Sequence, residues 1–153
     1  MLTALENGHH PLDRNAAEAL KRWALLDGVP EYMANVCGDQ ALMRAVKLGL
    51  GDTPVLAMET IWILLSKEAT HSILLQHDVI AFLVEIIQES DDKLKLHAVT
   101  AMQQLVKCQQ SGQALRQARD SIAKALRPVA ERMDDSEMHQ AAMYICDALQ
   151  IQI

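Results

Sequence analysis

The chain has 153 residues, of which 50% are hydrophobic, and it carries a formal net charge of −6 at pH 7. This length fits one domain with a sizeable hydrophobic core, and the negative charge disfavours attraction of the whole surface to nucleic acid or anionic lipid. Only 3% of the residues are aromatic, while 8 are methionine, which favours helices packed through aliphatic side chains over an aromatic-rich sheet core.

Cysteine usage and hydropathy narrow the class of protein further. The 3 cysteines are an odd number without close spacing, so we expect reduced core residues rather than disulfides or a structural zinc site. Charged residues such as Glu59, Lys67 and Glu85 interrupt the most apolar segments, and none approaches the roughly 20 residues needed to span a bilayer. The N-terminus lacks the pattern of a secretory signal. These features predict a cytoplasmic protein, with the nucleus as the alternative location.

The first third of the chain predicts a series of short helices. Residues 1–12 contain a glycine, two histidines and a proline and are expected to form an N-terminal cap or a frayed start. A helix is predicted from residue 13 to Gly28, where the glycine should end it. Pro30 then suits the first turn of a further short helix, because a proline needs no amide partner there.

Two breaks and two helices follow. Gly38 and Asp39 are expected to separate the short helix from a helix over 40–48. A second break, rich in glycine, precedes a helix over 54–66 that is nearly all apolar. Since its apolar residues surround the helix axis, we expect it to be packed on several sides.

The segment from 78 to 107 predicts a helical hairpin. Its first half carries apolar residues at the spacing of an amphipathic helix, and acidic residues then interrupt the pattern. Asp91 and Asp92 suit the N-terminus of the second helix, where free amide groups favour negative charge. The second helix has an apolar stripe made of Ala98, Ala101, Met102 and Leu105. Such a hairpin cannot bury both of its faces alone, so it needs neighbours.

A fixed offset of 41 residues relates the predicted helices to one another. Ala16, Ala57 and Ala98 follow each other at this offset, and after Lys107 it increases to 43 or 44 residues. Leu20 matches Ile61 and Met102, and Trp23 matches Leu64 and Leu105. The offset divides the chain into a partial repeat at 13–29 and three repeats at 30–70, 71–111 and 112–153.

This organisation resembles the armadillo repeat, and HEAT-type repeats are similar. The period, the plan of three helices and the small residues that open the third helix, AVTAMQQL here, carry the resemblance, which covers nearly the whole chain. It implies an all-α fold, a right-handed α-solenoid forming a single domain over 1–153. Stacked repeats also bury their apolar stripes on one another, and about three are needed for stability. The alternative fold is a compact orthogonal helical bundle.

The sequence contains no pattern of catalytic residues, no phosphate-binding loop and no metal-ligand motif. We therefore expect no enzyme activity, no cofactor and no metal site. His71 and His77 flank a predicted short helix, and their spacing of six residues places them on different faces. They are expected to be surface or capping residues. Paired aspartates at 91–92 and 134–135 precede third helices and are expected to cap them.

The resemblance implies that partners bind on the third helices, which in armadillo proteins line a groove for peptides or helices. That family often places Trp and Asn at two groove-facing positions. Matching those positions gives the pairs Glu18 and Arg22, Glu59 and Ile63, Thr100 and Gln104, and Tyr144 and Ala148. The predicted groove set is Glu59, Ile63, Thr100, Gln104 and Tyr144. Only Gln104 keeps an amide, which disfavours a basic nuclear-localisation peptide and favours a partner helix or a partly apolar segment.

Basic residues gather in the segment Lys107–Arg132. The basic patch consists of two pairs with a spacing of three residues, which places each pair on one helical face: Arg116 with Arg119, and Lys124 with Arg127. Such a patch suits an acidic partner or a phosphate backbone. The alternative function is therefore a nucleic-acid-binding helical-repeat domain, although without interleaved aromatic residues a solvated face is favoured.

Apolar residues near the C-terminal end predict self-association. The set consists of Met143, Leu149, Ile151 and Ile153, with Ile145 beside them. A terminal repeat normally needs a polar cap, so we expect a second copy or a further segment to cover this end. The leading functional prediction is a non-catalytic scaffold that holds a protein partner, a peptide or a helix, in its groove and forms a homodimer.

Overall fold

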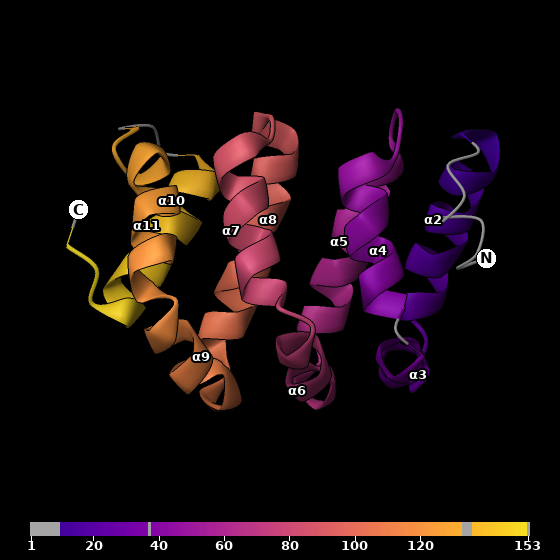
Figure 1. Cartoon of the computed structure of the whole chain (residues 1–153), viewed down its shortest axis with the longest axis horizontal. Helices are drawn as coiled ribbons and strands as arrows, with labels where there is room; N and C mark the ends of the chain where they lie inside the picture. Colours follow the sequence, from indigo (N-terminus) through magenta and orange to yellow (C-terminus); the bar gives the residue numbers. More distant parts are fainter. Residues whose placement is uncertain (1–9, 37, 133–135, 153) are drawn as a thin grey trace. The chain divides into compact units, whose positions relative to one another are not determined.

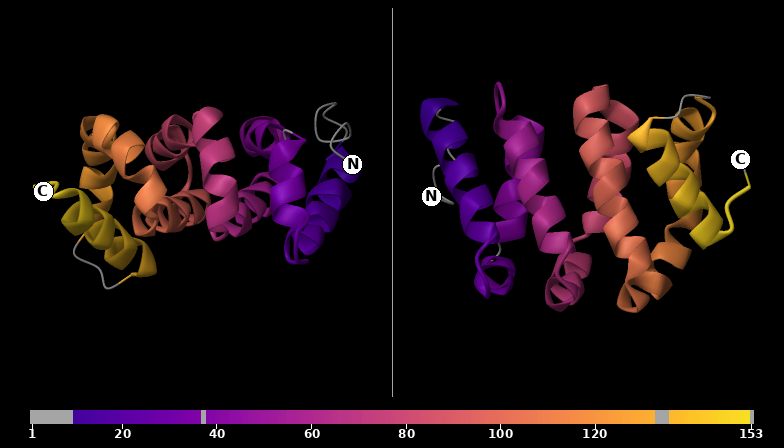
Figure 2. Two further views of the ribbon diagram at one scale, coloured as in Figure 1. Left: turned by 90° about the horizontal axis from the view of Figure 1, so that it is seen from below. Right: turned by 180° about the vertical axis from the view of Figure 1, so that it is seen from behind.

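The computed structural model describes residues 10–36, 38–132 and 136–152. These residues form ten α-helices and one short 3-10 helix and contain no strand, which confirms the predicted all-α class for the described part of the chain. The chain divides into two compact units, Met1–His77 (unit 1) and Asp78–Ile153 (unit 2). The helices of the two units are drawn in Figure 1 and from two further sides in Figure 2.

Unit 1 is organised around one apolar helix. Its helices are α2 (His10–Ala24), α3 (Val29–Asn35), α4 (Gly38–Leu48), α5 (Thr53–Leu65) and α6 (Glu68–Gln76). Helix α5 packs against α2 and α4 along its length and also contacts α3 and α6 (Figures 1 and 2). Eight of its residues are buried, because its apolar side chains point to several neighbours at once. The prediction of a helix packed on several sides is confirmed.

The turns of unit 1 differ in detail from the sequence-based expectation. Helix α2 ends at Ala24, four residues before Gly28, because two short backbone turns follow it and Gly28 then adopts a left-handed conformation with φ of 77°. Pro30 lies in the first turn of α3, as predicted. Gly38 and Asp39 do not form a break, since both lie in the first turn of α4.

Trp23 is the clearest departure from the repeat pattern. Its matched residues, Leu64 and Leu105, are fully buried, whereas Trp23 is 52% exposed. Helix α2 is buried through a narrow stripe of small and aliphatic residues, namely Ala16, Ala17, Leu20 and Ala24. Trp23 lies outside this buried stripe.

Unit 2 consists of two helical hairpins that pack on each other. Its elements are α7 (Val79–Glu89), α8 (Asp92–Lys107), the 3-10 helix η1 (Gln109–Ser111), α9 (Gly112–Gln117), α10 (Arg119–Ala130) and α11 (Glu137–Leu149). The predicted hairpin is α7 with α8. Helix α8 packs on α11 and α7 packs on α10, so each hairpin buries the apolar stripe of the other (Figure 1).

Side-chain caps fix where the second helix of each hairpin begins. Asp91 accepts a hydrogen bond from the backbone N–H of Leu94 at 2.9 Å, which confirms its predicted capping role. Ser136 caps α11 by accepting from the N–H of His139 at 3.2 Å. The predicted caps at 134–135 lie outside the described residues.

Within each unit, helices related by the sequence offset lie against each other. In unit 1, α2 contacts α5 and α3 contacts α6; in unit 2, α8 contacts α11 and α7 contacts α10. The alanines at matched positions, Ala57, Ala98 and Ala142, are fully buried. A methyl side chain allows two helices to approach closely, which fits the complete burial of these residues.

No single described helix is long and apolar enough to span a membrane. The consecutive helices α6 and α7 meet that criterion of length and composition only when they are counted together.

Candidate functional site

In unit 1, the predicted groove residues belong to a surface of paired charges. Glu59 of α5 forms an ion pair with Lys21 of α2 at 2.7 Å, and Glu18 pairs with Arg22 within α2 at 3.1 Å. Ile63 is only 6% exposed, so it is a core residue rather than an exposed contact. The α2–α5 surface therefore presents charged side chains that already have partners.

In unit 2, three predicted groove residues differ in what they offer to a partner. Thr100 is half-buried, and its hydroxyl lies 3.0 Å from the carbonyl oxygens of both Leu96 and His97, so its donor is used within α8. Gln104 is half-buried, and its side-chain amide makes no hydrogen bond to another described residue. Tyr144 of α11 is 43% exposed. Gln104 and Tyr144 are therefore the two that remain available.

Lys107 completes this surface. Its Nζ lies 5.8 Å from the centre of the Tyr144 ring, which is within the range of a cation–π interaction. Lys107 follows Gln104 by three residues, so both project from the same side of α8. We call Gln104, Lys107 and Tyr144 the α8–α11 surface. Sequence reasoning placed Lys107 only in the basic segment, because its contact with Tyr144 depends on the packing of two helices.

The α8–α11 surface combines three kinds of group. A side-chain amide can donate and accept hydrogen bonds at the same time, the ammonium of Lys107 can pair with a carboxylate, and the exposed part of the Tyr144 ring offers apolar area. This combination suits a peptide or helix that carries both an acidic and an apolar side chain.

The basic patch is not continuous along one helix. Arg116 lies in α9, whereas Arg119 begins α10, because the chain changes direction at Ala118. The prediction that these two arginines share one helical face is wrong. Lys124 and Arg127 do lie on one helix, α10, and both are exposed.

Two arginines of the basic segment are engaged within unit 2. Arg119 donates from Nε to the carbonyl oxygen of Leu149 at 3.0 Å, and its guanidinium also donates to the carbonyl oxygen of Gln150. Arg132 donates to the Asp92 carboxylate at 3.1 Å. Arginine at the C-terminal end of a helix satisfies free carbonyl groups and opposes the negative end of the helix dipole. These contacts explain part of the basic segment without a nucleic acid.

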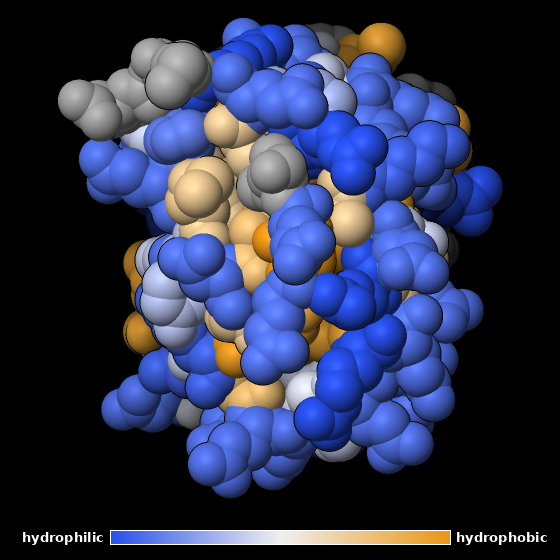
Figure 3. All heavy atoms as spheres, turned by 90° about the vertical axis from the view of Figure 1, so that its left-hand side faces the viewer, coloured by the Kyte–Doolittle hydropathy of each residue, from blue (hydrophilic) through white to orange (hydrophobic). Residues whose placement is uncertain are grey.

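The residues predicted for self-association are exposed to different degrees. Met143 is exposed, Leu149 and Ile151 are half-buried, and Ile145 is fully buried, which corrects its place in an exposed end face. Ile153 lies outside the described residues. The side of unit 2 seen in Figure 3 shows apolar residues in a narrow strip between hydrophilic ones.

The histidines and cysteines have structural positions. His71 is buried, and its Nε2 lies 2.6 Å from the carbonyl oxygen of Leu65, which contradicts the expected surface or capping role. His77 does cap α6, and its Nδ1 lies 2.6 Å from Oδ2 of Asp39. Burial, with a smaller contribution from the adjacent Asp147 charge, raises the pKa of the Cys146 thiol to about 11.

Among the described residues, no group of three or more histidine, cysteine, aspartate or glutamate side chains is placed to hold a metal ion. The cysteines at 108 and 146 are not joined by a disulfide, and the one at 37 lies outside the described part. Comparisons of the chain with family models, with curated proteins and with solved structures found no match.

Proposed function

We propose that this chain is a non-catalytic interaction scaffold that binds a segment or a helix of a partner protein on its third helices. The scaffold is a right-handed α-solenoid built from armadillo-like repeats of three helices. This proposal is supported by the contact of repeat-related helices within each unit, α2 with α5 and α8 with α11. Such stacking is what allows a repeat to bury its apolar stripe on the next one.

The α8–α11 surface is the observation that carries the binding proposal. Gln104 has an amide without a described partner, Tyr144 is partly exposed, and Lys107 lies over its ring. Aromatic residues are enriched among the contacts that dominate protein interfaces. The bound segment places an acidic side chain near Lys107 and an apolar side chain on the Tyr144 ring.

Affinity capture with purified wild type and a Gln104→Ala, Tyr144→Ala variant tests this proposal. The matched control is Gln113→Ala, Tyr32→Ala, which changes the same residue types at exposed positions on other helices. Partners retained by wild type and by the control, but lost from the first variant, would support binding at the α8–α11 surface. If both variants retain the same partners as wild type, this surface is not the binding site.

Self-association is the second part of the proposal. Exposed Met143 and the half-buried Leu149 and Ile151 provide apolar area at the end of unit 2. Light scattering at micromolar concentration should show a dimer for the wild type and a monomer for Met143→Lys. A monomeric wild type at these concentrations would rule out self-association through this face.

A further inference from the structure

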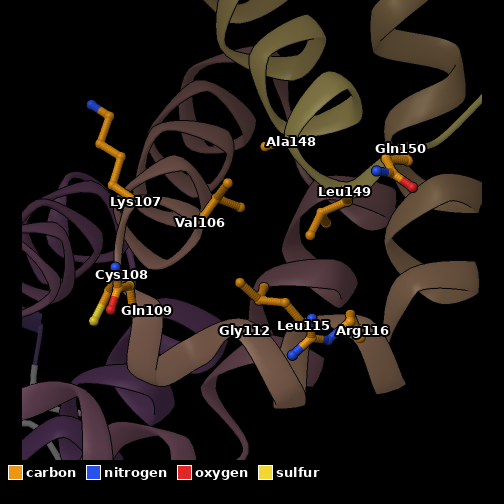
Figure 4. A pocket seen from close by; sticks show the side chains of 10 residues that line it. All are labelled: Val106, Lys107, Cys108, Gln109, Gly112, Leu115, Arg116, Ala148, Leu149 and Gln150. Atoms are coloured by element: carbon orange, nitrogen blue, oxygen red, sulfur yellow. The ribbon is translucent and has the colours of Figure 1, made fainter.

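Unit 2 contains a pocket of about 320 Å³ at the ends of α8 and α11, with α9 forming its third side (Figure 4). This volume is near the lower end of the range of about 300–1,000 Å³ that is usual for ligand pockets. The pocket therefore has room for a group of about the size of one or two amino-acid residues.

The inner part of the pocket is aliphatic. Val106, Leu115 and Leu149 come from three different helices, and their side chains point toward a common centre in Figure 4. Leu115 is fully buried, and the other two are half-buried. A branched aliphatic side chain placed among them would remove further apolar surface from water.

Arg116 supplies a positive charge beside this aliphatic centre. Its guanidinium lies over Gly112, where one of its nitrogens is 3.9 Å from the position that a Cβ on residue 112 would take. Arg116 is exposed, and its guanidinium forms no hydrogen bond or ion pair with another described residue. The ten residues that line the pocket include no aspartate or glutamate. The pocket is thus complementary to a negatively charged group.

Two helix ends lie beside the pocket and would repel a negatively charged ligand, but a neighbouring arginine reduces this repulsion. The C-terminal ends of α8 and α11 carry partial negative charge. Arg119 donates to the carbonyl oxygens of Leu149 and Gln150 and so offsets this charge at the end of α11. Lys107 lies in the last turn of α8, where its positive charge offsets the negative end of that helix, but its side chain extends away from the pocket. An arginine fork binds a carboxylate through two parallel hydrogen bonds.

We propose that this pocket binds the C-terminal residue of a partner peptide that ends in a branched aliphatic side chain. The side chain occupies the space among Val106, Leu115 and Leu149, and the terminal carboxylate pairs with Arg116. Gln109 and Gln150 also line the pocket, and a side-chain amide can donate to and accept from peptide groups. The site shares no residue with the α8–α11 surface except Lys107, and it does not depend on the function proposed above.

Fluorescence anisotropy on the full chain tests the ligand. The probe is a labelled hexapeptide, Ser-Gly-Ser-Gly-Ser-Leu, with a free C-terminal carboxylate. We expect saturable binding that weakens tenfold or more when the carboxylate is amidated or when the terminal leucine is replaced by serine. Equal binding of the free acid and the amide would overturn the proposal, as would equal binding of a peptide with an internal Glu-Leu pair. Absence of binding by every peptide would also overturn it.

Two arginine variants test the position of the site. Arg116→Gln should weaken binding of the free-acid peptide tenfold or more, while Arg127→Gln, the same substitution at an exposed position on α10, should leave the affinity unchanged. Equal losses in the two variants would indicate general charge attraction and would overturn the proposal. The Gln104→Ala, Tyr144→Ala variant should bind the peptide as wild type does, which separates this site from the α8–α11 surface.

Discussion

Replacing His77 by alanine is expected to destabilise unit 1 by about 2–3 kcal/mol. The carboxylate of Asp39 is completely buried in the first turn of α4. One of its oxygens contacts Nδ1 of His77 at 2.6 Å, and the other is buried without a hydrogen-bond partner among the described residues. The substitution therefore leaves both oxygens of the carboxylate without a hydrogen-bond partner among the described residues.

The size of this effect follows from the burial of the two partners. A hydrogen bond to a charged group contributes about 1.5–3 kcal/mol, and removing one partner of a buried pair costs about 3–5 kcal/mol. The His77 side chain is 20% exposed, so water can enter the space left by the imidazole and solvate part of the carboxylate. This access lowers the expected loss to about 2–3 kcal/mol, at or below the lower limit of the second range.

Urea unfolding followed by tryptophan fluorescence measures the effect in the correct unit, because both tryptophans, Trp23 and Trp62, belong to unit 1. A double-mutant cycle combines His77→Ala with Asp39→Asn and should give a coupling energy of about 1.5 kcal/mol or more. If His77→Ala changes the free energy of unfolding by less than about 0.5 kcal/mol, or if the two substitutions are additive, the contact does not stabilise the fold.

Three further predictions follow from the buried residues. Gly38→Ala should lower the free energy of unfolding by about 1–3 kcal/mol, because a Cβ there would lie 2.7 Å from the carbonyl oxygen of Met33. The control is Gly112→Ala, whose Cβ would meet nothing closer than 3.9 Å, and it should be neutral or slightly stabilising in the same urea assay. Thr70→Val should cost about 0.5–1.5 kcal/mol, since the buried hydroxyl donates to a carbonyl oxygen at 2.6 Å; an unchanged midpoint would refute this. Because its pKa is raised to about 11, Cys146 should resist iodoacetamide at pH 8 in the folded protein and react in urea, as peptide mass spectrometry would show. The free energy of unfolding should also fall as pH rises above about 9, because the thiol ionises there in the unfolded chain before it does in the folded one.

Local signals in the sequence predict the helices well. The spacing of apolar residues, the proline at position 30 and the acidic cap at Asp91 each act within a few residues, and the structure contains the corresponding helices. The apolar character of the segment 54–66 also predicts that α5 has several neighbours. Its bounds shift by only one residue, to Thr53–Leu65.

Contacts between distant residues could not be predicted in the same way. Asp39 and His77 are 38 residues apart, and neither has a neighbour in the sequence that marks it as buried. The exposure of Trp23 depends on the width of the face that α2 buries on α5. The sequence predicts a surface or capping role for His71, but the packing of α6 places its ring against the carbonyl oxygen of Leu65.

The candidate sites could not be fully predicted either, because they also depend on contacts between different helices. Arg116 and Arg119 have the spacing of one helical face, and no proline or glycine between them signals the change of helix at Ala118. The pocket beside Arg116 is built from the ends of three helices. Its residues have no common motif, because their proximity arises only when α8, α9 and α11 have packed.

Arg119 holds the end of α11 through main-chain oxygens of Leu149 and Gln150 rather than through their side chains. A carbonyl acceptor is present whichever residue occupies those two positions. Substitutions at positions 149 and 150 therefore preserve this contact, whereas replacing Arg119 removes it entirely. A saturation library of unit 2 selected for folding should therefore show stronger depletion of substitutions at residue 119 than at residues 149 and 150.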